Sequence, residues 1–289
     1  MVIIIKSEFY TMRWKDGKPK AVTLSYDDGV DGDKELISLL KKYNMKCTFN
    51  INSGLYSEEG ATRNPEWFFF RLPKSEATAL YNDPHCEVAC HGLEHGFFDK
   101  TPDAEAIYQV VADRRNLEEQ FGTIVTGMAY PYGTYSERTV EILKMCGISY
   151  CRTVRSTYSF DIPKNWLTLD PTCHHTEVEK LKELTEKFIS TDVKRDGNPL
   201  LFYLWGHTFE FIRDNNWDVI ENFCKKVSDK DDIWYATNIE IYNYVKAFEA
   251  LQFNAAFNKV YNPTATDVWI NHCNSEETVK IPAGETVCL

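Results

Sequence analysis

Short apolar runs alternate with stretches of helical periodicity over most of the chain. Between the runs, apolar side chains recur three and four residues apart, as in Leu36, Leu40 and Tyr43, which is the spacing of one helix face. Strands that alternate with helices pair in parallel, because each helix returns the chain to the same end of the sheet. We therefore predict an α/β fold that closes into a TIM-like barrel. The runs that read as strands are 21–26, 46–51, 86–90, 124–130, 148–153, 200–206 and 233–236.

Two regions interrupt this alternation. Residues 54–85 form a long insertion that contains the aromatic run 67–70; such a cluster more often belongs to the core, although it could also line a sugar site. After residue 250 the pattern changes to short β runs separated by proline and glycine turns. We predict a barrel domain over residues 1–250 and a small β-rich appendage over residues 251–289.

Helix starts are marked by side chains that cap the first turn. Ser136 begins a helical period that Gly147 is expected to end. Two further starts have the capping-box spacing of Thr and Glu three residues apart, at 176–179 and 237–240.

Charge and hydropathy narrow the classes of partner. A net charge of −11 argues against nucleic acid and anionic membranes, because both require a basic surface. No apolar run approaches the length of a membrane span, and the run Met1–Ile5 is too short for the core of a signal peptide. A neutral substrate is compatible with this charge. The oligomeric state stays open.

The cysteines indicate a reducing compartment. There are nine, an odd number without a C-x-x-C pair, in a chain too large to need disulfides for its stability. Cys86 and Cys90 are four residues apart in a predicted strand, which is too far to bridge. We expect free thiols and favour the cytoplasm. A secreted protein that had lost its leader would look the same, so an extracellular location stays open.

Candidate catalytic side chains follow the carboxyl ends of several predicted strands, the edge at which parallel α/β folds place their chemistry. Asp27 and Asp28 end the first strand, and two adjacent carboxylates usually persist where a cation needs them. His91 ends the third strand, and His95 lies one helical turn further on, so that both rings could face one metal. His207 ends the sixth. Their common position predicts a metal site.

These residues also carry a resemblance to a known family. The sequence Ser25–Gly29 is similar to the T-F-D-D-G motif of the polysaccharide deacetylases (NodB homology domain, carbohydrate esterase family 4). His91 and His95 resemble that family's H-[S/T]-x-x-H motif, and Pro131–Gly133 the end of its R-x-P-[Y/F]-G motif. The segment 204–207 is similar to the late strand that carries the family's last histidine. The likeness spans about residues 20–245.

The resemblance implies a distorted (β/α)7 barrel that binds one divalent metal, Zn²⁺ first and Co²⁺ as a substitute, and removes acetyl groups from a carbohydrate. It implies that Asp28, His91 and His95 bind the metal. Asp27 is expected to act as the general base and His207 as the general acid. The remaining expectations are that the amide of Tyr132 helps to hold the oxyanion and that the substrate contacts include Pro131, Tyr132 and Trp205.

The chemistry of these residue types agrees with the implied roles. Two imidazoles and a carboxylate leave a tetrahedral Zn²⁺ with open positions for water and substrate. An amine leaves poorly unless it is protonated, and histidine suits that task. An N-acetyl amino sugar is therefore the favoured substrate, and an O-acetylated carbohydrate is the alternative.

The chain departs from the family pattern in three places. Gly92 stands where the family has Ser or Thr, and Ala129 where it has an arginine that orients the base. The family's D-W-x-D segment has no clean match, although the interval holds Asp161, Trp166 and Asp170 and ends with His174 and His175, which could face the site or the surface. Adjacent strand ends lie about 5 Å apart, so we predict that Arg152 or Arg155, at the next strand, replaces the missing arginine; both could equally be surface residues.

Two other functions stay open. The loss of the arginine would suit a barrel that binds carbohydrate without catalysis. The sequence His91–His95 also fits the H-x-x-E-H pattern of zinc peptidases, with Glu94 as the base, but that reading leaves Asp27 and Asp28 unexplained.

Overall fold

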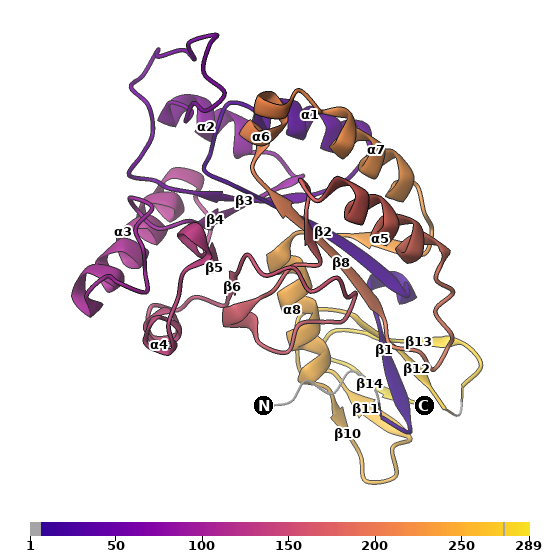
Figure 1. Ribbon diagram of the computed structural model, residues 1–289. Helices are drawn as coiled ribbons and strands as arrows, with labels where there is room; N and C mark the ends of the chain where they lie inside the picture. Colours follow the sequence, from indigo (N-terminus) through magenta and orange to yellow (C-terminus); the bar gives the residue numbers. More distant parts are fainter. Residues whose placement is uncertain (1–6, 274) are drawn as a thin grey trace.

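A curled parallel sheet surrounded by helices forms the body of the molecule (Figure 1). The computed structural model describes residues 7–273 and 275–289, so the run Met1–Ile5 lies outside the described residues. All seven predicted strands are present, as β2 (Lys20–Asp27), β3 (Cys47–Ile51), β4 (Cys86–Cys90), β5 (Gly127–Ala129), β6 (Tyr150–Arg152), β8 (Leu200–Gly206) and β9 (Ile233–Tyr235). One short strand of the sheet, β7 (Cys173–His174), was not predicted.

The sheet is organised around β2. Along one edge β2 pairs with β8; along the other it pairs first with β9 and then, towards its carboxyl end, with β3. The strand order is β6-β5-β4-β3-β2-β8-β7, and all its pairings are parallel. The two ends of this strand order are joined only by short pairings. Leu169 forms a single bridge to Arg152 of β6, and Cys173 of β7 pairs with Leu204 of β8. The fold is therefore the predicted α/β barrel in its distorted (β/α)7 form.

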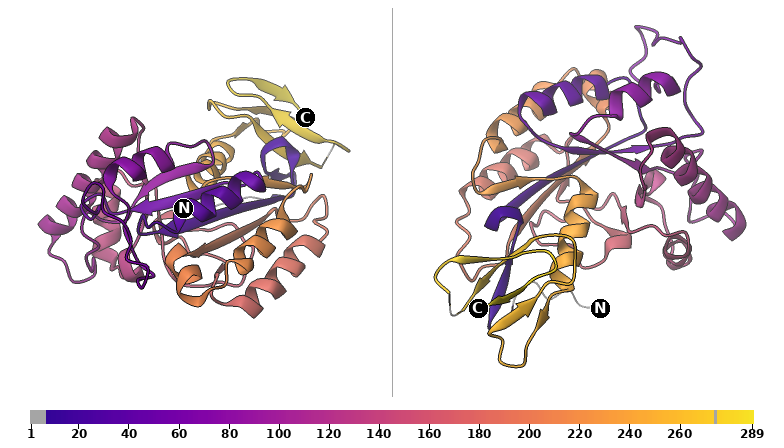
Figure 2. Two further views of the ribbon diagram at one scale, coloured as in Figure 1. Left: turned by 90° about the horizontal axis from the view of Figure 1, so that it is seen from above. Right: turned by 180° about the vertical axis from the view of Figure 1, so that it is seen from behind.

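The helices lie mostly around the outside of the curled sheet (Figure 2). They begin and end where short polar segments interrupt the apolar periodicity. The capping box at Thr237 is confirmed, and Ser136 caps its helix as predicted. The box at 176–179 is wrong, because the hydroxyl of Thr176 contacts His174 Nδ1 at 2.7 Å and that helix begins at Val178. The helices are α1 (Asp33–Lys42), α2 (Lys74–Tyr81), α3 (Asp103–Phe121), α4 (Glu137–Met145), α5 (Val178–Ser190), α6 (Thr208–Asp214), α7 (Asp218–Val227) and α8 (Asn238–Glu249).

The alternation of side chains along the central strands creates two hydrophobic clusters. In β8, Phe202 and Leu204 point into the larger cluster beneath the outer helices, whereas Leu201 and Tyr203 point into the smaller one. This division follows from the period of two in a strand. The smaller cluster also contains the apolar face of α8 and the C-terminal strands, so that α8 packs between the sheet and the C-terminal region.

The C-terminal region is β-rich, as predicted. Its strands form two antiparallel three-stranded sheets, β10-β11-β14 and β1-β12-β13, and β1 (Tyr10–Arg13) comes from the beginning of the chain. The division at residue 250 stays a prediction. These C-terminal strands are β10 (Gln252–Phe253), β11 (Lys259–Tyr261), β12 (Val268–His272), β13 (Thr278–Ile281) and β14 (Thr286–Cys288).

Three further expectations can be compared with the structure. Cys86 and Cys90, at the two ends of β4, are free thiols, as predicted. No helix in the described part of the chain is long and apolar enough to cross a membrane. The core assignment of the aromatic run is wrong: Trp67 is 60% exposed and Phe68 45% exposed. The run lies in a surface loop, and Phe68 packs only partly against Phe209 of α6.

Candidate active site

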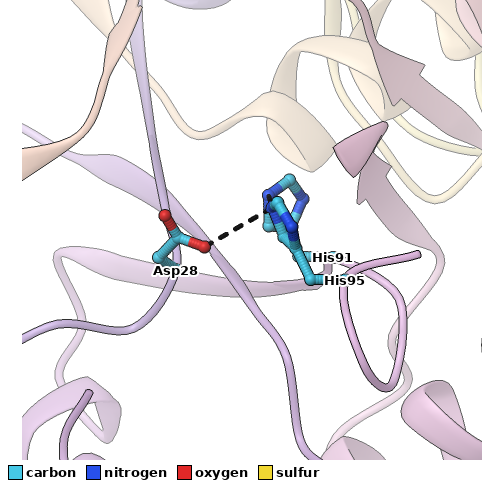
Figure 3. A group of neighbouring side chains, drawn as sticks. All are labelled: Asp28, His91 and His95. Carbon is cyan, nitrogen blue, oxygen red and sulfur yellow. Dashed lines mark hydrogen bonds and ion pairs between the residues drawn. The ribbon is translucent and has the colours of Figure 1, made fainter. Parts of the chain in front are cut away.

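The predicted metal ligands meet at the carboxyl end of the sheet. Figure 3 shows Asp28 at the end of β2 facing the rings of His91 and His95, which follow β4. The distance from His95 Nε2 to His91 Nε2 is 3.2 Å, and to Asp28 Oδ1 it is 3.6 Å. Two ligands about 2.0–2.1 Å from a tetrahedral zinc ion lie about 3.4 Å apart, so this spacing suits a shared cation.

Left-handed backbone turns bring these side chains together. Successive side chains of a strand point to opposite faces, so Asp27 and Asp28 could not both face the site in regular β conformation. Asp28 has φ of +80°, which ends the alternation and turns its carboxylate back towards the site. Gly92 and His95 also have positive φ, at +73° and +56°. The predicted helical turn at His91–His95 is therefore wrong; the two rings converge through a glycine-containing turn.

The two histidines are prepared to act as neutral ligands. Burial lowers the pKa of His91, although Asp27 and Asp28 oppose this effect. Burial and the neighbouring His91 lower the pKa of His95 to about 4. His91 Nδ1 lies 2.9 Å from the carbonyl oxygen of Ala129, an acceptor that keeps the proton on Nδ1 and leaves Nε2 for a metal. The donor set, neutral at both imidazoles, fits a divalent cation.

An unpredicted arginine contacts the acidic ligand. Arg71, which lies within the insertion and shortly before α2, donates to Asp28 Oδ1 at 2.9 Å and to Asn52 Oδ1 at 3.3 Å. Asn52 in turn donates to the carbonyl oxygens of His91 and Gly92, which ties the turn of His91 to the end of β3. The sequence gives no local signal for Arg71, because it reaches the site across a long surface loop.

Asp27 is held by two donors and is fully enclosed. Arg152 pairs with Asp27 Oδ2, and Asn50 donates to Asp27 Oδ1 at 2.8 Å. Burial alone would raise the pKa of Asp27, but the positive charge of Arg152, with smaller contributions from His91 and His207, holds it well below its usual range. Asp27 is therefore an ionised carboxylate in a fixed orientation.

The predicted replacement of the missing arginine is confirmed for one of the two candidates. Arg152 is fully buried, and its guanidinium lies 4.1 Å from the centre of the Trp205 ring while it pairs with Asp27. Arg155 instead pairs with Asp170 at the surface. Strand β6 thus provides the charge that Ala129 in β5 lacks.

Methionine substitutions at the two arginines test this assignment. We expect Arg152→Met to lower the free energy of unfolding by about 3–5 kcal/mol, because it leaves a buried carboxylate without its partner. Turnover should also fall while the metal stays bound, since a base that is poorly aimed loses much of its effect. Arg155→Met is the matched control and should change neither quantity. Denaturant titration, kcat and metal content provide the measurements; equal effects in the two variants would remove the assignment.

His207 and His91 both approach the same carboxylate oxygen of Asp27. The Nε2 atoms of His91 and His207 are 3.7 and 3.8 Å from Asp27 Oδ2. The backbone N–H of His207 donates to Glu210 Oε2 at 3.1 Å, and its Nδ1 lies at the same distance from that oxygen. Burial alone would lower the pKa of His207, but the hydrogen bond to Glu210 and the charge of Asp27 raise it. Glu210 was not predicted, although its spacing from His207 is that of a capping box.

The remaining predicted positions are distributed around this centre. Tyr132 has φ of +57°, and its half-exposed ring stacks on Phe97 at 4.0 Å and meets His95 edge-on at 4.4 Å. Pro131 is buried beside it. Trp205 is 6% exposed, under Arg152, so its contact with substrate stays a prediction.

The interval in which the family's D-W-x-D segment would fall places two histidines next to Glu210. Asp161 is exposed, and Trp166 packs on Tyr242. Asp170 forms an ion pair with Arg155. His174 and His175 both point towards Glu210, and His175 is 1% exposed, which excludes the surface alternative for this residue.

Three solved structures are similar to this one to different extents. A protein of Mycobacterium smegmatis described as a polysaccharide deacetylase has 18% identity, with 84% of this chain and 95% of that chain aligned at a TM-score of 0.57. A Streptococcus pyogenes deacetylase in complex with acetate has 18% identity, over 50% of this chain and 61% of that chain, at a TM-score of 0.44. A pseudoenzyme of carbohydrate esterase family 4 from Bacillus anthracis has 14% identity, over 81% of this chain and 68% of that chain, at a TM-score of 0.49.

The sequence itself also matches a family. The comparison with curated proteins gives no match. Residues 15–151 match the family model for polysaccharide deacetylases, and this segment contains Asp27, Asp28, His91 and His95 in the motifs that carry the resemblance. The segment 15–151 therefore carries the sequence pattern of the polysaccharide deacetylase family.

Proposed function

We propose that the chain is a metal-dependent deacetylase that removes N-acetyl groups from an amino-sugar substrate. The observation that carries this proposal is that Asp27 lies near both a proposed metal ligand and the proposed general acid. Asp27 Oδ2 lies near Nε2 of His91, one of the proposed metal ligands, and near Nε2 of His207, whose partner is Glu210. A base for the attacking water and an acid for the leaving nitrogen are what amide hydrolysis requires.

Each group of residues in the site has a separate role in the proposed hydrolysis. Asp28, His91 and His95 would hold the divalent cation, which supplies Lewis-acid polarisation of the acetyl carbonyl and a more acidic water. Asp27 removes the proton from the attacking water, and Arg152 with Asn50 keeps its carboxylate aimed. The amide of Tyr132 donates to the developing oxyanion.

His207 completes the reaction by protonating the amine as it leaves. Its raised pKa keeps a larger fraction of the ring in the acidic form near neutral pH. Deprotonated Asp27 and protonated His207 can coexist because Arg152 stabilises the former and Glu210 the latter. This pair of protonation states favours an amide over an ester, because an alkoxide needs the proton less.

A loop of exposed aromatic side chains supports a carbohydrate as the substrate. Phe68 and Phe69 pack against Phe209, which lies two residues after His207. Trp67 is 60% exposed in the same loop. Exposed aromatic rings next to a polar site suit the apolar faces of sugar rings.

The peptidase alternative finds no support in the geometry. Glu94 would have to act as the base, but its carboxylate accepts a hydrogen bond from Gln109 Nε2 of α3 at 3.0 Å. The carboxylate that pairs with Arg152 and faces both His91 and His207 is Asp27. An O-acetyl esterase stays a second candidate, because the same base and metal group would serve an ester.

Alanine at position 207 separates the two acetyl substrates. We expect His207→Ala to lower kcat on N-acetylglucosamine oligomers by about 10²–10⁴-fold, the usual contribution of a general acid. An activated aryl acetate should lose much less, because its leaving group needs no proton. Steady-state assays on both substrates give the comparison, and equal losses would mean that His207 has another role.

Glutamine at position 210 tests the partner of the acid. Turnover should fall as the pH rises through the pKa of His207, because only the protonated ring can donate. Glu210 raises that pKa, so Glu210→Gln should move the alkaline limb of the kcat profile to lower pH. The profile is measured with one equivalent of metal per chain, with the surface variant Glu183→Gln as control. An alkaline limb at the same pH in the Glu210 variant and the wild type would contradict the role of Glu210.

A further inference from the structure

A second group of side chains that could hold a metal ion lies next to His207. It consists of His174, His175 and Glu210, whose ligand atoms lie within 4.8 Å of one another. His174 ends β7, His175 follows it, and Glu210 lies in the first turn of α6. The mechanism of deacetylation gives a role to Glu210 alone among them.

The spacing of this group resembles that of the first. Glu210 Oε2 is 3.4 Å from His174 Nε2 and 3.3 Å from His175 Nε2. The corresponding distances among Asp28, His91 and His95 are 3.2 and 3.6 Å. Both sets match the separation of about 3.4 Å that two ligands of one tetrahedral zinc ion have.

Hydrogen bonding alone does not account for the contacts at Glu210. Its Oε2 atom already faces the amide and Nδ1 of His207, each at 3.1 Å. Two more nitrogen atoms approach the same oxygen at distances beyond a normal hydrogen bond. His175 Nε2 is buried and has no hydrogen-bond partner in the described structure. A buried ring nitrogen without a partner is costly, and a cation would satisfy it.

Hydrogen bonds to the other ring nitrogens fix the orientation of both imidazoles. His175 Nδ1 is 3.1 Å from the hydroxyl of Tyr26. His174 Nδ1 is 2.7 Å from the hydroxyl of Thr176 and also accepts the backbone N–H of Thr176 at 3.2 Å. Such outer contacts fix the rings so that Nε2 points at the metal. Two imidazoles and one carboxylate form a donor set that zinc accepts, with a fourth position for water.

We propose that His174, His175 and Glu210 form a second binding site for a divalent cation of the zinc type. The site is separate from Asp28, His91 and His95. It does not depend on the proposed deacetylase activity, because it requires only that the three side chains bind an ion.

Metal counting on the purified full chain tests this proposal. The protein is stripped of metal, loaded with Zn²⁺, freed of unbound ion by gel filtration and analysed by elemental mass spectrometry. We expect two ions per chain in the wild type and one each in Asp28→Asn and His174→Ala. The double variant should bind none. His85→Ala is the matched control, because His85 pairs with Asp83 at the protein surface, and it should keep two ions.

Anomalous diffraction from crystals of the zinc-loaded protein locates the ions. It distinguishes ions in the two groups of ligands from ions bound by cysteine sulfurs. The expected result is one peak within each group of three ligands. Glu210→Gln keeps the shape of the side chain and should remove the second peak alone. The proposal is overturned if the wild type binds a single ion that Asp28→Asn removes, if His174→Ala still binds two, or if the second ion lies at cysteine sulfurs. Circular dichroism confirms that each variant is folded.

Discussion

Replacing Asp27 by asparagine should lower kcat on an N-acetylglucosamine oligomer by about 10²–10⁴-fold, the usual contribution of a general base. The change keeps the shape of the side chain and removes the charge that accepts the proton. Asp27 is not one of the three proposed metal ligands, so the metal content should stay at the wild-type level. Steady-state kinetics and elemental analysis of the same preparation provide the two measurements.

The stability of the Asp27 variant gives an internal check. In Asp27→Asn the buried guanidinium of Arg152 loses its anionic partner, so the free energy of unfolding should fall as well. Asp161→Asn, at an exposed position, is the control and should leave turnover and stability unchanged. A variant at position 27 that keeps wild-type turnover would exclude Asp27 as the base.

Loss of the metal is the second change with a large expected effect. Chelation should reduce turnover to the background of the uncatalysed reaction, and Zn²⁺ or Co²⁺ should restore it. His95→Ala should have the same low activity without recovery at these metal concentrations, because it removes one of three ligands. His85→Ala is the control and should recover fully. Activity that persists in the chelated wild type, or a metal-loaded structure with His95 turned away, would contradict the ligand assignment.

The barrel was accessible from the sequence because its strands are strongly apolar. Runs such as 200–206 are buried along most of their length, so their character is visible without knowledge of their neighbours. Strand β7 was not predicted because a strand of two residues has no detectable period. Only its pairing with β8 defines it as a strand. The aromatic run 67–70 was misassigned for the opposite reason: apolar composition alone does not show whether a loop folds inwards.

The convergence of Asp28, His91 and His95 was predictable from the sequence, but the backbone conformation that brings them together was not. Asp28, His91 and His95 follow strand ends that parallel pairing brings together, and their motifs carry the resemblance to the family. The helical turn assumed for His91–His95 failed because Gly92 and His95 adopt positive φ, which spacing alone cannot reveal.

The partners of the catalytic residues depend on contacts between distant segments. Arg152 was within reach of prediction because β6 adjoins the strand that lacks the arginine. Asn50 reaches Asp27 across the pairing of β3 with β2, and Arg71 reaches Asp28 from a long loop, so neither has a sequence signature. Glu210 did have one, three residues after His207, but that spacing also marks an ordinary helix cap.

Acetate release by the metal-loaded protein tests the central claim most directly. N-acetylglucosamine oligomers, acetylated xylan and an N-acetylated peptide are compared at equal concentration, with acetate and new free amine measured in the same samples. We predict that the oligomer releases acetate fastest, that one amine appears for each acetate, and that chelation and Asp27→Asn each abolish both signals. Acetate release from xylan alone, cleavage of the peptide, or no release from any substrate by the metal-loaded protein would contradict an N-deacetylase centred on Asp27.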